Sequence, residues 1–569
     1  MKTFITSTLF LFFVSMHSFS QTSNFEANKI ATFCKVWGFL KYHHPAVAKG
    51  KYDWDKVFLE KITTVETLNS KEELNNFYYS WINSLGKLKT DSYRTPPANA
   101  ILSNYDSTWY KDTNVFSDKV VDLLTQVKNN SRSKNHYVKK KMFGLAAASY
   151  ENENLYKDSV YPSAEMRLLA LSRYWNVMNY FYPYKYLTDT KWQDVIVEFV
   201  PQFVDAKNIK EYHLSMSALF ATISDSHTVL LFNLHSSNVL LPPFNNKIVE
   251  DKVIVLNAFN DTLCKNNDIQ YGDVISKING QSIKDYISYY SKYLSASNYG
   301  SLCFRLAPYN IWSDLQYPAT ITYDRNGNTF EKTLAAYPYT SIFKNWQALT
   351  LAKNDTTTEK YRMLENNIAY VNLKNLKSKK EAKEVLKNIG STKGVILDIR
   401  NYPNSSIFTP VTNFFCPSKK AFAKFAHQSI KYPGALNAPK TLYCGKKGGV
   451  KYNGKVIVLT NESTQSFAEY FTMALKTIPG VILIGNNTAG ADGSIKYLTL
   501  PGSIRTSFSN EAAYYPDGKQ TQRIGITPDI KVLPTIEGVR LRKDEVLDKA
   551  VEVLGKAVTS GSNAAVAGK

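Results

Sequence analysis

The sequence holds a serine whose surroundings suit covalent chemistry. Ser466 lies in "NESTQSFAEYF" (461–471), directly after the apolar run "KVIVLT" (455–460). Glu469 follows it by three residues, and Ser-x-x-Glu before an apolar run is the signature of a helix capping box. A serine at a strand-to-helix junction can also act as a nucleophile, because the helix dipole favours negative charge and the next N–H, of Phe467, can donate to an oxyanion. The local pattern leaves both interpretations open.

A nucleophilic serine needs a base, and one of the eight histidines has a suggestive setting. His227 lies in "SDSHTVL" (224–230), beside Asp225 and Ser226, between a helix-like pattern and an apolar run. A structural role for this histidine remains the alternative. The spacing of His and Cys predicts no metal site and no cofactor. The junction at Ser466 is not Gly-x-Ser-x-Gly, which excludes an α/β-hydrolase elbow.

The elements that must position these residues form an α/β pattern over residues 355–555. Four apolar runs, "IAYVNL", "GVILDIR", "KVIVLT" and "GVILIG", alternate with helix-like segments such as "KKEAKEVLKNI". This alternation predicts a mainly parallel sheet covered by helices. Functional residues in such folds lie at the carboxyl ends of the strands, which is where Ser466, the loop after "GVILDIR" and "NNTAG" (486–490) occur.

An internal repeat precedes this core. "VWGFLKYHHPAVAKGKYDW" (36–54) matches "YWNVMNYFYPYKYLTDTKW" (174–192), and both copies continue into helix-like segments. The repeat predicts two similar helical layers, copy 1 with a linker over residues 21–160 and copy 2 over residues 161–239, which carries the "DSH" segment. Residues 240–340 read as short β-like runs, and "GDVISKINGQSIKD" resembles part of a PDZ domain, a fold that binds extended peptide ends.

The two ends of the chain predict export and a flexible tail. Lys2, the apolar run "LFLFFV" (9–14) and the small residues before Gln21 are typical of a signal peptide over residues 1–20. We expect a periplasmic or extracellular protein with no membrane span after signal removal. Residues 556–569 are predicted to be a disordered tail.

Composition adds fewer constraints on function. The net charge of +21 is scattered, and the sequence shows no nucleic-acid-binding motif, so no nucleic-acid partner is predicted. Among five cysteines, Cys416 and Cys444 are the most plausible bridge.

The order of these motifs resembles one known family. "DSHT", "GDVISKINGQSI", "GVILDIRNYP", "STQSFAEYF", "GNNTAG" and "YYPDGKQTQRIGITPDIKV" follow one another as in the tail-specific, or C-terminal processing, serine peptidases. The resemblance covers roughly residues 165–555. It implies a multidomain α/β fold: helical N-terminal repeats, a PDZ-like β-rich domain and a ClpP/crotonase-like protease core.

The resemblance also implies roles for individual residues. Ser466 aligns with the nucleophile. The position of the lysine base used by one variant of the family is Ala491 here, and Lys496 is out of register. The tricorn-type variant uses a Ser-His pair, which implies His227 as general base and Ser226 as an auxiliary polar group. The supporting glutamate of that variant falls on Gln522, an amide that can orient a partner but carries no charge.

One loop departs further from the family pattern. The usual D-x-R-x-N-x-G-G segment, which supplies an oxyanion N–H, here ends in Asn404 and Ser405. Glycine permits positive φ, and asparagine tolerates it best among other residues, so Asn404 joins Phe467 as the candidate oxyanion donor. The leading hypothesis is an exported serine endopeptidase that acts on protein or peptide substrates. The alternative is a catalytically weak or inactive pseudopeptidase that serves as a peptide-binding module. Neither predicts an oligomeric state.

Overall fold

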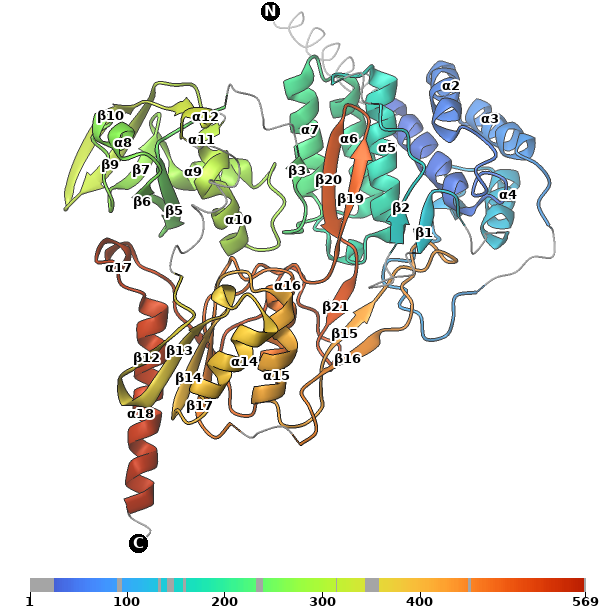
Figure 1. Ribbon diagram of the computed structural model, residues 1–569. Coiled ribbons are helices and arrows are strands. Elements are labelled where there is room, and N and C mark those ends of the chain that lie inside the picture. The colour runs from blue at the N-terminus through green and yellow to red at the C-terminus, as the bar shows by residue number, and fades with distance from the viewer. Residues whose placement is uncertain are drawn as a thin grey trace, which may run out of the picture. The chain divides into compact units, whose positions relative to one another are not determined.

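A computed structural model describes residues 25–89, 95–130, 135–140, 148–156, 160–231, 239–313, 315–342, 358–448 and 452–566 (Figure 1). It divides into two compact units. The first comprises residues 1–223, 426–438 and 496–511, and the second comprises residues 224–425, 439–495 and 512–569. The predicted signal peptide lies outside the described residues.

The first unit is mainly helical, as the repeat predicts. A helix over residues 25–43 is followed by α2 (Trp54–Thr67), α3 (Lys71–Ser84), α4 (Asp118–Asn129), α5 (Ala164–Phe181), α6 (Trp192–Val204) and α7 (Ile209–Ala221). Short strands β1 (Val138–Lys140) and β2 (Ala148–Tyr150) form an antiparallel pair. Strands β19 (Ile495–Leu500) and β20 (Ile504–Ser509) neighbour each other in a further sheet.

The two repeat copies are built on the same tryptophan pair. In copy 1, the indole N–H of Trp37 donates to the carbonyl of Trp54 (2.9 Å) and that of Trp54 donates back to Trp37 (3.1 Å). In copy 2, Trp175 and Trp192 exchange the same two bonds at 2.8 and 3.2 Å. The ring planes meet at 15° and 14°. The internal repeat read from the sequence is therefore confirmed as a structural repeat.

A buried ion network joins the copies. Arg173 of copy 2 forms an ion pair with Asp55 of copy 1 and lies 3.2 Å from Glu153, whose carboxylate accepts from Lys41 of copy 1 at 2.6 Å. The side chains of Arg173 and Lys41 are 1% exposed. Charges this deeply buried need their partners, because a lone charge in the interior is strongly destabilising.

The second unit contains a β-rich domain. Its antiparallel sheet has the order β10-β9-β7-β6-β5, and helices α8 (Asp261–Asn266), α9 (Ile283–Tyr290) and α10 (Tyr299–Arg305) accompany it. The strands are β5 (Phe244–Val249), β6 (Lys252–Ala258), β7 (Val274–Ile278), β9 (Ala319–Arg325) and β10 (Asn328–Leu334). The turn at Asn279-Gly280 has positive φ at both residues, and it joins β7 to the short β8 (Gln281–Ser282) before α9 begins.

The rest of the second unit is the predicted α/β core. Its sheet has the order β12-β13-β14-β17-β18-β22, in which only the edge strand β12 (Tyr361–Leu364) is antiparallel. The others are β13 (Ile368–Asn372), β14 (Gly394–Asp398), β17 (Lys455–Thr460), β18 (Ile482–Gly485) and β22 (Ile530–Lys531). The four apolar runs quoted from the sequence are β13, β14, β17 and β18, so that prediction is confirmed.

Helices cover both faces of this sheet (Figure 1). Alternate strand residues, such as Val395 and Val458, pack in one apolar cluster with α14 (Lys379–Asn388), α15 (Phe408–Phe415) and α16 (Phe467–Leu475). Their neighbours Ile396 and Ile457 pack with α18 (Glu545–Val566) in a second cluster. Burial on both faces is the reason that these strands read as continuous apolar runs. The multidomain fold expected from the sequence is confirmed.

Two domain limits differ from the sequence-based ones. Residues 426–438 and 496–511 were expected in a continuous core, but they belong to the first unit. There Gln428 donates to the carbonyl of Phe181 (2.9 Å), and Tyr212 donates to that of Pro501 (2.8 Å). The "DSH" segment was expected with repeat copy 2, yet residues from Ser224 onward belong to the second unit.

The C-terminal helix is longer than expected. Helix α18 continues to Val566, through most of the predicted disordered tail. No helix in the described ranges is both long and apolar enough to cross a membrane.

The ion network of the first unit makes a stability prediction. Asp55→Ala removes one of two carboxylates beside buried Arg173 and should lower the urea midpoint by an amount equivalent to roughly 3 kcal/mol. Glu60→Ala is the matched control on the same helix, because Glu60 forms only an exposed pair with Lys56 at 3.9 Å. Equal midpoints for the two variants would contradict the importance of the buried pair.

Candidate active site

Ser466 lies between β17 and α16 in a strained conformation. Its φ and ψ are 57° and −122°, a region that non-glycine residues rarely adopt. Its N–H donates to the carbonyl of Ala491 (3.0 Å) and to the Glu469 carboxylate (3.1 Å). Its hydroxyl points to the carbonyl of Gly493 at 3.4 Å, which is a long contact. The bond from the Ser466 N–H to the Glu469 carboxylate is one of the two bonds of the predicted capping box.

Glu469 is the hub of the serine junction. Its side chain is fully buried and also accepts from the Ala491 N–H (3.0 Å), the Gly490 N–H (2.9 Å) and the Thr488 hydroxyl (2.5 Å). Burial raises the pKa of Glu469 to about 7. These three donors and the Ser466 N–H oppose that rise. A single carboxylate thus ties the start of α16 to the "TAG" loop (488–490).

The "DSHT" turn (225–228) lies against this same loop. The Ser226 hydroxyl donates to the carbonyl of Ala489 in the "TAG" loop (2.9 Å), and the Ser226 carbonyl accepts from the side-chain amide of Gln465 (2.9 Å). Gln465 immediately precedes Ser466. The structure therefore brings the His227 turn and the Ser466 junction together, although they are far apart in the sequence.

Serines of the β-rich domain hold the other side of the turn. Ser295 bonds both the N–H and the carbonyl of Asp225, at 2.9 and 3.0 Å. Ser297 accepts from the Ser226 N–H at 2.9 Å, and Ser301 lies 2.8 Å from the Ser226 hydroxyl. Ser226 is thus a structural link between three segments. Nothing in the stretch "SASNYGS" (295–301) signals this role in the sequence.

Arg305 clamps the backbone on both sides of His227. Its guanidinium donates to the carbonyls of Ser226 (2.8 Å) and Thr228 (2.6 Å). Burial lowers the pKa of His227 below its ordinary value, the Asp225 carboxylate acts to raise it, and the Arg305 charge lowers it. Burial also lowers the pKa of Arg305 to about 10, so it remains charged at neutral pH.

Gln522 reaches the same turn. It is fully buried, and its amide nitrogen donates to the Asp225 carboxylate at 3.2 Å. Ala491 stands at the position where one variant of the family has its lysine base. It is fully buried, and an alanine side chain carries no basic group. Lys496 belongs to the first unit, in β19.

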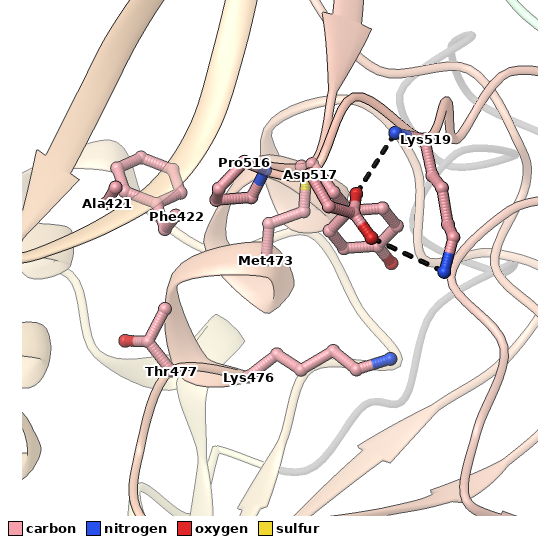
Figure 2. Close-up of a pocket in the computed structure, with 9 residues that line it drawn as sticks. Ala421, Phe422, Met473, Lys476, Thr477, Pro516, Asp517 and Lys519 are labelled. Carbon is pink, nitrogen blue, oxygen red and sulfur yellow. Dashed lines mark hydrogen bonds and ion pairs between the residues drawn. The ribbon is translucent and has the colours of Figure 1, made fainter.

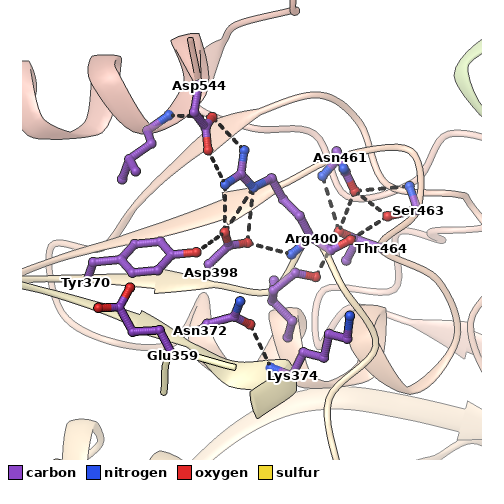
Figure 3. A network of polar contacts seen from close by, with 12 residues as sticks. Glu359, Tyr370, Asn372, Lys374, Asp398, Arg400, Asn461, Ser463, Thr464 and Asp544 are labelled. Atoms are coloured by element: carbon purple, nitrogen blue, oxygen red, sulfur yellow. Dashed lines mark hydrogen bonds and ion pairs between the residues drawn. The ribbon is translucent and has the colours of Figure 1, made fainter. Parts of the chain in front are cut away.

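The candidate oxyanion loop follows β14 and is anchored by an ionic network (Figure 3). Arg400 binds Asp398 at 2.6 Å and Asp544, just before α18, at 2.7 Å. Tyr370 donates to the same Asp398 carboxylate at 2.8 Å. The Thr464 hydroxyl donates to the carbonyl of Ile399 (3.1 Å), which joins the loop to the serine junction.

Within this loop, Asn404 does not adopt a glycine-like conformation. Its φ and ψ are −72° and 132°, and its side chain accepts from the Ser406 N–H at 2.9 Å. The positive φ that glycine would permit is therefore not used here. Phe467 is the first residue of α16, where backbone N–H groups have no acceptor within the helix.

A separate pocket of about 400 Å³ lies along α16 beyond the serine junction (Figure 2). Its lining includes Phe422, Met473 and Lys476, together with the Asp517–Lys519 ion pair. None of the predicted site residues lines it. Thr477, at its edge, lies 3.4 Å from both the Cys416 and the Cys444 sulfur.

The cysteine prediction is corrected by these contacts. Cys416 and Cys444 are free thiols, although the fold places both sulfurs beside one hydroxyl. Across the described residues, no group of His, Cys, Asp and Glu is arranged to hold a metal ion.

Parts of this chain are similar to known proteins. Residues 367–532 match the family model described as Peptidase family S41. A curated Chlamydia trachomatis protein without a functional name is 30% identical over 109 residues, 18% of each chain, and an uncharacterized Chlamydia muridarum protein is 26% identical over 117 residues, 20% of each chain. The chain thus aligns with about a fifth of the length of these relatives.

Solved structures extend the likeness in fold. Mature CPAF complexed with lactacystin matches with a TM-score of 0.55 and 13% identity, over 70% of this chain and 99% of that one. A second structure of mature CPAF gives a TM-score of 0.54. At this identity the likeness concerns the fold alone.

The Glu469 hub predicts a defined effect of an isosteric change. Glu469→Gln places an amide N–H₂ among four donors, so at least one buried donor loses its acceptor. We expect a loss of about 1–3 kcal/mol in unfolding free energy, together with slower labelling of Ser466 by a fluorophosphonate probe. Glu384→Gln, at an exposed position of α14, is the matched control. Wild-type stability and labelling in Glu469→Gln would show that the hub does not organise the junction.

Proposed function

Because residues 367–532 match the model of peptidase family S41, we propose that this protein is a serine endopeptidase in which Ser466 is the nucleophile and His227 the general base. The observation that carries this proposal is the strained Ser466 junction, hydrogen-bonded through Gln465 to the turn that bears His227. Strain of this kind persists where the surrounding structure enforces it, and it clusters at active sites.

The chemistry proceeds through an acyl-enzyme. The Ser466 Oγ bonds to the carbonyl carbon of the scissile peptide while its proton passes to the His227 imidazole. The carbon–nitrogen bond then breaks, and His227 returns the proton to the leaving amine. Water, activated by the same base, hydrolyses the ester, which releases a carboxylate and restores Ser466.

The state of His227 supports its role as base. Burial holds its pKa below the ordinary value, so the imidazole is neutral at neutral pH and able to accept a proton. The Phe467 N–H and the 402–405 loop, with Asn404, would receive the oxyanion. Removal of one oxyanion donor typically costs about a hundred- to a thousandfold in rate, so the conformation of this loop sets the turnover.

We propose that the β-rich domain engages extended or C-terminal peptide segments. Its sheet ends in β5 and β10, and an edge strand can pair with an added peptide strand. We further propose that the protein is exported to the periplasm or the medium, as its N-terminal sequence predicts.

The nucleophile and base are tested together. Ser466→Ala and His227→Ala should each lower kcat/KM for an unfolded protein substrate by at least about a thousandfold, with unchanged circular dichroism. A fluorophosphonate probe should label the wild type and not Ser466→Ala. Absence of labelling in the wild type, with peptide binding retained in Ser466→Ala, would favour the binding-module alternative, which the extended conformation of Asn404 keeps open.

The pH profile tests the base separately. Protonated His227 cannot accept the serine proton, and its pKa lies below 6.5, so the acid limb of kcat/KM should have its midpoint below pH 6.5. The profile is measured by steady-state cleavage, with circular dichroism at each pH as the control for unfolding. A midpoint at or above pH 6.5 would exclude a buried, depressed histidine as the base.

A further inference from the structure

The contact between Gln522 and Asp225 has a consequence for the base. Both side chains are fully buried, and the Gln522 nitrogen donates to the Asp225 Oδ1 at 3.2 Å. The Gln522 Oε1 has no hydrogen-bond partner in the part of the chain that the structure describes. The amide must present its nitrogen to Asp225, because its oxygen would repel the carboxylate.

Asp225 is held rigidly beside His227. Its Oδ1 also accepts from the His227 N–H at 3.0 Å, and its own backbone is fixed by Ser295. The carboxylate therefore folds back over the turn that carries the imidazole. Its negative charge acts to raise the pKa of His227, which means that it stabilises the imidazolium.

A glutamate at position 522 would conflict with this arrangement. Two carboxylates in hydrogen-bond contact inside the protein cannot both ionise, and one of them would keep a proton. An amide at position 522 avoids this repulsion and leaves the charge on Asp225. The family pattern has a glutamate at this position to support the histidine base, and this chain has Gln522. An acid from another position could take that supporting role here.

We propose that Asp225 supplies the negative charge that supports His227, and that Gln522 is a positioning residue that holds this carboxylate in place. The inference rests on the proposed serine-peptidase function. When His227 takes the proton of Ser466, the new imidazolium is subject to two opposing charges, the Arg305 guanidinium and the Asp225 carboxylate. Without Asp225, the like charge of Arg305 would disfavour proton transfer to the imidazole.

Asp225→Asn is the decisive variant. Asparagine retains an oxygen that can accept from the His227 and Gln522 N–H groups, so geometry is kept while the charge is lost. We expect kcat to fall by about a hundredfold or more, with little change in KM and in the thermal midpoint. Asp261→Asn, an exposed site in the same domain, is the matched control. Activity within about threefold of the wild type would overturn the proposal.

Two further variants keep the proposal testable if Asp225→Asn folds poorly. Asp225→Asn/Gln522→Glu exchanges amide and carboxylate, and it should recover at least about tenfold of the lost kcat. Gln522→Glu alone should not raise kcat, because the added acid meets Asp225. A clear increase would mean that position 522 is the vacant place of the supporting acid, and the proposal would be wrong.

A titration separates this inference from the proposed function. With ¹³C-labelled histidine, the His227 resonance is assigned by its absence in His227→Ala, and its pKa is measured by NMR without any turnover. Asp225→Asn should lower the pKa of His227 measurably, and the exchanged double variant should restore it. This shift in a protein without peptidase activity would refute only the proposed function. An unchanged pKa would refute the role of Asp225 even in an active enzyme.

Discussion

The carboxylate of Glu469 is the constraint on which the candidate site depends. It is fully buried, and four donors from two segments satisfy it. Because an unsatisfied donor in the interior is costly, these bonds fix the register between α16 and the "TAG" loop. The strained backbone of Ser466 is one product of that register.

Hydrogen bonds also connect the turn that bears His227 to the segment that bears Ser466. Ser226 bonds the "TAG" loop and the β-rich domain at once, and Arg305 holds the carbonyls on either side of His227. The second unit therefore builds its site from three separated segments. Residues 295–305 of the β-rich domain bond the turn that bears His227, so a movement of these residues would displace that turn. The repeats of the first unit are helical and are each built on a pair of tryptophans.

The departures from the family pattern follow from local electrostatics and backbone geometry. Gln522 faces a carboxylate, so an amide fits where an acid would be repelled. Asn404 stays extended and uses its side chain to cap the next turn. Ala491 leaves no base on its segment.

Much of this could be predicted from the sequence alone. Continuous apolar runs determine the strands of the core, the Trp37 and Trp175 motifs determine the repeat, and the motif order identifies Ser466 and His227 as candidates. Local patterns suffice there because periodicity and family order are properties of the chain itself. Asp225's contact with Gln522, the Arg305 clamp and the free thiols of Cys416 and Cys444 were decided only by tertiary structure. They join residues remote in sequence, and no local pattern records which buried polar groups will meet.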